Sequence, residues 1–334
     1  MNNPVLVEVT RGTMVESRHR GAVAVMDAKG ATVFAVGDVA RPVFPRSAVK
    51  AFQALPLLES GAADRYGLTP AEIALAVASH SGEPAHAETA AGMLAKAGRD
   101  AACLECGAHW PMNDQAARDL AAAGRKPSAL HNNCSGKHAG FVCLACHLGE
   151  DPAGYVKPEH RVQREVKAAL EEMTGTALGD DVRGVDGCSI PTYAIPLTAL
   201  ATGFARFGAG EGMGPERRKA AEGICDAAAA HPWNVAGTGR LDTVLMEVFG
   251  RRVFMKTGAE GVYCAALPEL GLGVALKADD GAKRAAECMF SAVLARTLPL
   301  GDAERARLDP HVVHTERNWN GIEVGTTRPT GALA

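Results

Sequence analysis

Segments typical of β-strands stand at both ends of this sequence, and segments typical of helices fill its middle. Near the N-terminus, "VLVEVTRG", "GAVAVMDAKG" and "ATVFAVGDV" are rich in valine, and "RRVFMKTG", "GVYCAAL" and "LGVALKAD" follow the same pattern towards the C-terminus. Short turns such as Ala28-Lys29-Gly30 join the strands, so we expect an antiparallel sheet rather than a parallel one. The order predicts an α/β protein of the α+β type, with a sheet built from N- and C-terminal strands and a helical middle region.

The middle of the chain predicts a series of helices. Thr69, Pro70 and Glu72 form the start signal of one of them, with an N-cap, a first-turn proline and a capping-box acid. A final helix, "GAKRAAECMFSAVLART", follows the last strands. The helices expected before it are 47–60, 69–79, 84–97, 113–123, 134–147, 158–174, 192–206, 215–230 and 239–249. We therefore expect a sheet lobe of about residues 1–45 and 250–334 and a helical lobe of about residues 46–249.

Composition narrows the class of partner and the compartment. The 334 residues are 47% hydrophobic and carry a net charge of −3, which gives no reason to expect a nucleic-acid partner. No apolar run approaches the roughly 18 residues of a membrane span, and "MNNPVLVEVTRG" is not a signal peptide, so we expect no membrane association. The nine cysteines, an odd number, indicate a cytoplasmic protein with reduced thiols.

The stretch "FPRSAVKAFQ" places Ser47 three residues before Lys50. Residues at this spacing share one face of a helix, and a neutral lysine there accepts the proton of a serine that acts as a nucleophile. The alternative is a solvated helix face with no chemistry. The apolar neighbours Val49 and Phe52 favour a central helix.

A second motif, Lys256-Thr257-Gly258, lies on a predicted strand. Ser-x-x-Lys early and Lys-Thr-Gly late on a strand form the signature pair of penicillin-binding proteins and serine β-lactamases. The Ser-Asp-Asn element of that signature is missing, and the nearest candidate is Ser79 in "ASHSG", at the end of the 69–79 helix. Ser79 is either a relay hydroxyl between the two lysines or a turn residue.

Two polar clusters contain metal-ligand side chains. "HNNCSGKHAG" holds Cys134 and His138, and "GVDGCSI" holds Asp186 and Cys188, all of them ordinary zinc ligands. The alternative is a pair of buried free cysteines beside a capped helix. Two C-x-x-C pairs compete as zinc sites, and we interpret both as structural; they are Cys103 with Cys106 and Cys143 with Cys146.

Taken together, the motifs resemble the rhizobial-type, or class 3, L-asparaginases. The resemblance extends in order over nearly the whole chain. The motifs that carry it are "VEVTRGTMVESRHRGAVAVMD", "PRSAVKAFQ", "ASHSGEPAH", "HNNCSGKHAGF", "GVDGCSIPTYA" and "KTGAEGVY".

The resemblance implies a serine-β-lactamase-like fold, a homodimer and the hydrolysis of L-asparagine to L-aspartate and ammonia. It implies a single catalytic unit, residues 1–334, with two serine–lysine tandems, Ser47 with Lys50 and Ser79 with Lys256. It also implies a zinc ion, Zn2+, and replaces His138 by Lys137 as a ligand, because the matching motifs are C-x-x-K and D-x-C. The implied zinc ligands are Cys134, Lys137, Asp186 and Cys188.

Three further residues are expected to contact the substrate. His138 lies beside the zinc ligands or touches the substrate. Glu260 binds the substrate ammonium or forms an ion pair with a strand neighbour. Arg46 pairs with a carboxylate or extends to solvent.

Three other functions remain open on the sequence. A Ser-x-x-Lys glutaminase differs by one methylene of substrate, which is worth about 1–3 kcal/mol of discrimination. A β-lactam hydrolase is disfavoured by the missing Ser-Asp-Asn. A non-catalytic zinc-binding protein on the same scaffold would keep an inert Ser47.

Overall fold

The structure is a computed structural model that describes residues 3–334. Clustering of its contacts divides the chain into two compact units. Unit 1 comprises Met1–Ala48, Ile195–Ala209 and Met255–Ala334, and unit 2 comprises Val49–Ala194 and Gly210–Phe254. The α+β architecture, with an antiparallel sheet from both chain ends and a helical middle, is confirmed.

Unit 1 is built on an eight-stranded sheet in which every pairing is antiparallel. The strands lie in the order β11-β12-β1-β2-β10-β9-β8, and β3 pairs with β2 off this path. The strands of the sheet are β1 (Val5–Arg11), β2 (Met14–Asp27), β3 (Thr32–Val36), β8 (Phe254–Gly258), β9 (Val262–Leu267), β10 (Leu272–Ala278), β11 (His314–Arg317) and β12 (Glu323–Pro329). The remaining elements are the short pair β4 (Pro42–Val43) and β7 (Ile195–Pro196), and the helices α8 (Leu197–Ala209), α12 (Lys283–Thr297) and α13 (Asp302–Val312).

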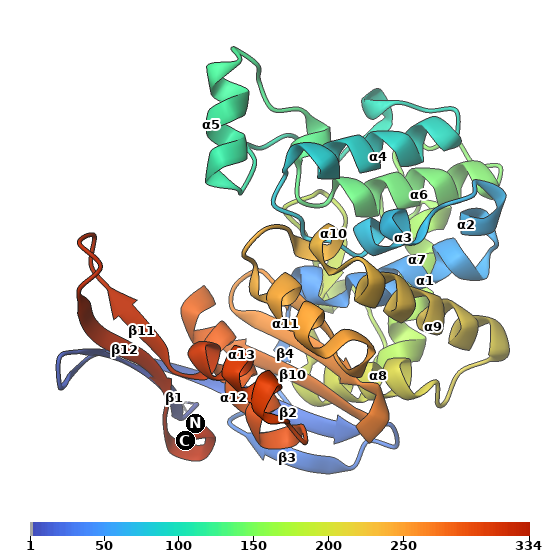
Figure 1. The fold of residues 1–334 in the computed structure, drawn as a ribbon. Helices are drawn as coiled ribbons and strands as arrows, with labels where there is room; N and C mark the ends of the chain where they lie inside the picture. Colours follow the sequence, from blue (N-terminus) through green and yellow to red (C-terminus); the bar gives the residue numbers. More distant parts are fainter. Residues whose placement is uncertain (1–2) are drawn as a thin grey trace. The chain divides into compact units, whose positions relative to one another are not determined.

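Helices cover both faces of the central strands of unit 1 (Figure 1). On one face, Gly273 of β10 has no room for a side chain because the backbone of α8 at Ala201 lies against it. On the other face, Tyr263 of β9 stacks on Phe290 of α12 with 5.0 Å between ring centroids. Strand β9 is consequently buried at all six positions, which explains why its sequence is a continuous apolar run rather than an alternating one.

Unit 2 is mainly helical, and α6 is its most buried helix, with eleven of thirteen residues buried. In Figure 1, α5 stands apart from the other helices of this unit. The helices are α1 (Lys50–Glu59), α2 (Ala62–Arg65), α3 (Pro70–Ala76), α4 (Pro84–Lys96), α5 (Asp114–Ala122), α6 (Ser135–His147), α7 (Arg161–Thr174), α9 (Pro215–Ala230), α10 (Pro232–Ala236) and α11 (Leu241–Phe249). Two short strands, β5 (Arg183–Val185) and β6 (Pro191–Tyr193), form a hairpin.

Local start signals behave as the sequence predicts, with one exception. The capping box of α3 forms, because Thr69 Oγ1 accepts from the backbone N–H of Glu72 and the Glu72 carboxylate accepts from the backbone N–H of Thr69. The helix expected at 192–206 begins only at Leu197, because Pro191 and Pro196 lie in extended segments that pair as strands.

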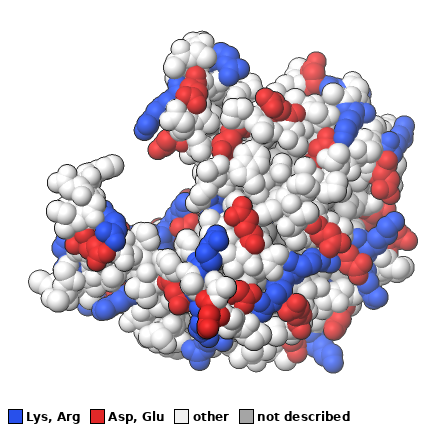
Figure 2. Space-filling view, in the orientation of Figure 1, with Lys and Arg blue, Asp and Glu red and all other residues white. Residues whose placement is uncertain are grey.

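Side-chain charge on the surface is mixed. Figure 2 shows Lys and Arg interspersed with Asp and Glu over the visible face. Across the described part of the chain, no helix is long and apolar enough to cross a membrane.

Candidate functional site

Ser47 lies in unit 1, in a 3-10 turn that leads directly into α1. The turn spans Arg46–Val49, and Lys50 is the first residue of α1. Arg46 has a φ of 52°, in the left-handed region that costs a side-chain-bearing residue energy and that occurs often at functional sites. Ser47 is half-buried.

The Lys-Thr-Gly strand lies against the segment that carries Ser47. A methyl group on Gly258 of β8 would overlap the carbonyl oxygen of Pro45 and would lie 3.3 Å from the Cβ of Ala48. Lys256 is fully buried on the same strand, and its Nζ donates to the Thr257 carbonyl at 2.9 Å. Unit 1 therefore brings two of the predicted site residues, Ser47 and Lys256, onto neighbouring segments.

Lys50 and Ser79 meet in unit 2. The Lys50 Nζ lies 3.1 Å from Ser79 Oγ and donates as well to the Ala78 carbonyl and to Cys134 Sγ, the latter at 3.1 Å. Lys50 is fully buried, and the loss of solvation lowers its pKa from the ordinary lysine value, with nearby Lys137 acting in the same direction. A lowered pKa is what allows a lysine to accept a proton near neutral pH.

Ser79 is buried three residues beyond the end of α3, rather than at the end of a 69–79 helix. Its backbone N–H donates to the Val235 carbonyl of α10 at 3.0 Å. The serine is thus fixed through its main chain, while its hydroxyl faces the Lys50 amine.

The four predicted zinc ligands also gather in unit 2. Cys134 caps the N-terminus of α6 and Lys137 lies in its first turn, while Asp186 and Cys188 lie in the turn between β5 and β6. Lys137 Nζ donates to Cys188 Sγ at 3.1 Å, and Cys188 Sγ lies 3.9 Å from Asp186 Oδ2. All but Asp186 are buried.

The groups of this cluster differ in the direction in which their pKa values are shifted. A hydrogen bond from Cys188 and the amines of Lys50 and Lys137 hold the pKa of Cys134 well below its usual range. The same bond, together with burial, raises the pKa of Cys188. Burial opposes the charge of Lys137, but the two thiols and the Asp186 carboxylate outweigh it and raise the pKa of that amine.

The donor set is chemically suited to zinc, since two thiols, an amine and a carboxylate are ligand types that the ion accepts once they lose their protons. Between residues 3 and 334, no three His, Cys, Asp or Glu side chains are arranged to hold a metal without help.

His138 follows Lys137 and points to another partner. The Tyr155 hydroxyl accepts from the backbone N–H of Glu105 and forms a hydrogen bond with His138 Nδ1, at 2.6 Å. His138 Nε2 is buried with no hydrogen-bond partner, and burial together with Lys137 and Lys50 lowers the pKa of the ring well below its usual range. His138 is therefore neutral.

Glu260 lies in the exposed turn between β8 and β9, with a φ of 59°. Its carboxylate reaches towards Gly281, and it is one of the charges that oppose the effect of burial on the Lys277 pKa.

The nine cysteines are all free thiols, including both C-x-x-C pairs. Burial raises the pKa of Cys106 to about 12, as expected for an unreactive thiol.

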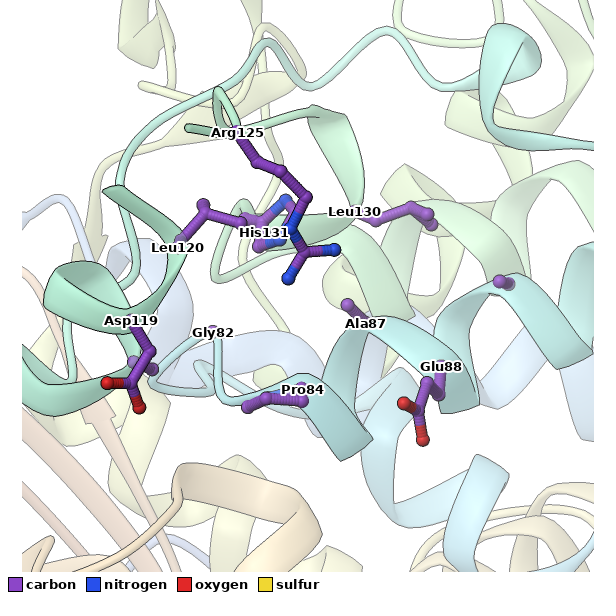
Figure 3. Close-up of a pocket in the computed structure, with 11 residues that line it drawn as sticks. Gly82, Pro84, Ala87, Glu88, Asp119, Leu120, Arg125, Leu130 and His131 are labelled. Atoms are coloured by element: carbon purple, nitrogen blue, oxygen red, sulfur yellow. The ribbon is translucent and has the colours of Figure 1, made fainter. Parts of the chain in front are cut away.

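A separate pocket of about 270 Å³ opens beside the Ser79 loop in unit 2 (Figure 3). Gly82 and His131 line it, together with the exposed side chains of Glu88, Asp119 and Arg125. None of the predicted site residues lines this pocket.

Sequence reasoning missed His80, which is fully buried next to Ser79. The available signal was the dipeptide itself, since histidine is rarely buried without a hydrogen-bonding role.

A buried lysine hydrogen-bonded to a serine is an arrangement that hydrolases with an activated hydroxyl use. The chain belongs to the L-asparaginase II family, whose sequence profile matches residues 7–329. It is thus an L-asparaginase, a hydrolase of linear amides, and the family expected from the motifs is confirmed. No curated protein matches the chain significantly.

Several solved structures are similar at low identity. A beta-lactamase from Mycobacterium bovis is 14% identical with a TM-score of 0.42, over 83% of this chain and 94% of that one. Mglu in its tris and glutamate form is 15% identical with a TM-score of 0.38, over 90% of this chain and 65% of that one. Mglu in its native form is 15% identical with a TM-score of 0.35, over 85% and 66%.

Proposed function

We propose that this L-asparaginase works through a covalent β-aspartyl ester on Ser47. The observation that carries the proposal is the Lys50 amine, which is fully buried and lies 3.1 Å from Ser79 Oγ. Burial lowers the pKa of this lysine, and an amide hydrolase with a serine nucleophile needs a base of that kind.

In the first half-reaction, Ser47 Oγ attacks the side-chain amide carbon of asparagine and gives its proton to Lys50. The carbon–nitrogen bond breaks, a proton passes to the leaving nitrogen through Ser79 and Lys256, and ammonia departs. In the second half-reaction, water attacks the ester carbon, gives up its proton to the same groups and releases L-aspartate. Ser47 Oγ then regains its proton.

Cys134, Lys137, Asp186 and Cys188 would hold the zinc ion of this proposal. Zinc bound there would fix the positions of these four side chains and so help to orient the α-amino and α-carboxylate end of the substrate. Lys137 and Cys188 must each lose a proton to act as ligands, and the pKa of each is raised, so the affinity for zinc should increase with pH.

The remaining site residues recognise the charged end of asparagine. Arg46 pairs with the α-carboxylate, Glu260 accepts from the α-ammonium, and neutral His138 contributes its Nε2. His138 supports this role because its Nε2 is buried without a partner. The homodimer and the cytoplasmic location belong to the same proposal, and light scattering of the purified protein tests the dimer directly.

The decisive experiment measures ammonia release from L-asparagine and from L-glutamine, with wild type and Ser47→Ala side by side. We expect rapid release from asparagine that Ser47→Ala abolishes. Intact-mass analysis after rapid acid quenching should show an aspartyl adduct on the wild type alone. Undiminished turnover by Ser47→Ala would show that Ser47 is not the nucleophile. Faster turnover of glutamine than of asparagine would show that the enzyme prefers glutamine. No release from either amide by folded, zinc-loaded protein would favour the non-catalytic alternative.

A further inference from the structure

Three aromatic rings stack in unit 2, starting at the residue that follows Ser79. The rings of His80 and His86 lie 4.8 Å apart at an interplanar angle of 17°, and those of His86 and Trp233 lie 3.9 Å apart at 6°. His86 Nε2 also donates to the Trp233 carbonyl at 3.1 Å. Because His86 packs against the face of the His80 ring, the stack fixes the orientation of that ring.

Hydrogen bonds fix the same ring at both of its nitrogens. The backbone N–H of Gly82, which only donates, lies 3.1 Å from His80 Nδ1, so Nδ1 is an acceptor. His80 Nε2 therefore carries the hydrogen and donates to Ser135 Oγ at 2.9 Å. His80 and Ser135 are both fully buried, so water does not replace this bond.

The bond between His80 and Ser135 joins the two segments whose side chains share the Lys50 amine. Ser135 is the first residue of α6, directly after Cys134. The Lys50 Nζ lies 3.1 Å from Ser79 Oγ on one segment and 3.1 Å from Cys134 Sγ on the other. A backbone bond from His80 N–H to the Asn133 carbonyl, at 3.2 Å, connects the segments a second time.

We propose that His80 is a positioning residue for the hydrolysis. Its Nε2–H bond to Ser135 holds Ser79 and the N-terminus of α6 at the spacing that lets one Lys50 amine reach both. The proposal rests on the catalytic roles proposed above for Lys50 and Ser79. Since His80 acts through Ser79, its loss lowers kcat and leaves the binding of asparagine nearly unchanged.

Two amide variants separate the two nitrogens of His80. In His80→Gln the side-chain amide reaches the position of Nε2 and keeps a donor for Ser135, but it loses the acceptor for Gly82. In His80→Asn the shorter amide keeps an acceptor for Gly82 and loses the bond to Ser135. Both variants lose the stacking with His86, so they are matched in their structural cost.

We expect kcat for asparagine to fall about 10–100-fold in His80→Asn and less than about threefold in His80→Gln, with KM changed less than about threefold in both. A purely structural role would instead lower kcat and thermal stability together, and alike in the two variants. Equal kcat in the two variants, or a loss that appears only in KM, overturns the proposal.

Ser135→Ala tests the bond from its other end and serves if His80→Asn does not fold. We expect it to lower kcat as much as His80→Asn does, and the double variant to be no slower than either single variant. Additive losses overturn the proposal. Ser79→Ala in the same assay separates the catalytic role of Ser79 from the positioning role of His80. Turnover near that of wild type in Ser79→Ala overturns the role of Ser79, whereas a slow Ser79→Ala beside a fully active His80→Asn overturns the role of His80 alone.

Discussion

Gly258 is the residue at which a single methyl group should disturb the nucleophile without touching it. A Cβ on Gly258 would overlap the Pro45 carbonyl oxygen. Real Cβ atoms essentially never come closer than 3.0 Å to another atom, and this contact would be more than half an ångström too short. A backbone atom has no rotamer to adopt, so Gly258→Ala must move the 45–48 segment away from β8, or β8 away from that segment.

The size of the effect follows from that displacement. A catalytic constellation tolerates a misplacement of about 0.5 Å, and an error of 1 Å costs on the order of 100-fold in rate. A displacement of Pro45 slightly above this tolerance, two residues before Ser47, should lower kcat about 10–100-fold. This loss corresponds to a rise of about 1.4–2.7 kcal/mol in activation free energy. Overpacking should also lower the free energy of unfolding by about 1–3 kcal/mol.

The assay is ammonia release from saturating L-asparagine, read together with thermal unfolding. Gly214→Ala is the matched control, because Gly214 has a φ of −65° and a Cβ there would meet nothing within 4 Å. We expect the control to keep its activity and to lose no more than about 1 kcal/mol of unfolding free energy, because alanine is a poorer N-cap than glycine. If Gly258→Ala turned over asparagine within twofold of wild type, the close packing of β8 would not be what positions Ser47.

Three further outcomes are expected. Lys50→Met should lower kcat by about 100–10,000-fold. Lys96→Met, which removes a partly exposed ion pair with Glu72 and a hydrogen bond to the Gly67 carbonyl, should leave kcat unchanged; equal activity of the two variants would contradict the role of Lys50 as base. Lys137→Met should abolish stoichiometric zinc binding measured by mass spectrometry of metals after dialysis, and retained zinc would show that no lysine ligand is needed. Burial lowers the pKa values of His80 and His86, so the unfolded state takes up protons first as pH falls below about 6.5. The free energy of unfolding should then decrease by up to about 1.4 kcal/mol per pH unit for each histidine, and urea titrations at pH 5.5 and 7.5 that give equal values would refute this.

The order of elements was predictable from the sequence because each signal is local. The turn at Ala28-Lys29-Gly30 joins β2 to β3, with Gly30 at a φ of 86°, and the capping box at Thr69 starts α3. The final strands β11 and β12 were not predicted as separate elements, because "HTERNWNGIEVG" is polar and lacks the valine-rich alternation of the other strands.

Contacts between distant residues were only partly predictable. The motif spacing identifies Ser47 and Lys50 because they lie three positions apart in the sequence. The bond from Lys50 to Cys134 joins residues 84 positions apart, so no period in the sequence indicates it. The bond from His80 to Ser135 joins residues 55 positions apart, and it depends on the packing of α3 beside α6, which no local pattern in the sequence indicates.

Glycines in the motifs explain how a chain with so few aromatic residues brings these groups together. Gly136 sits between Ser135 and Lys137 in α6, and a side chain there would overlap the backbone of Leu75 in α3. Because α3 leads into Ser79, this close approach of the two helices sets the distance across which the Lys50 amine reaches from Ser79 to Cys134. The glycine of "CSGKH" is thus required by helix packing, and a larger residue there would separate the serine from the thiol even with every polar residue of both motifs retained.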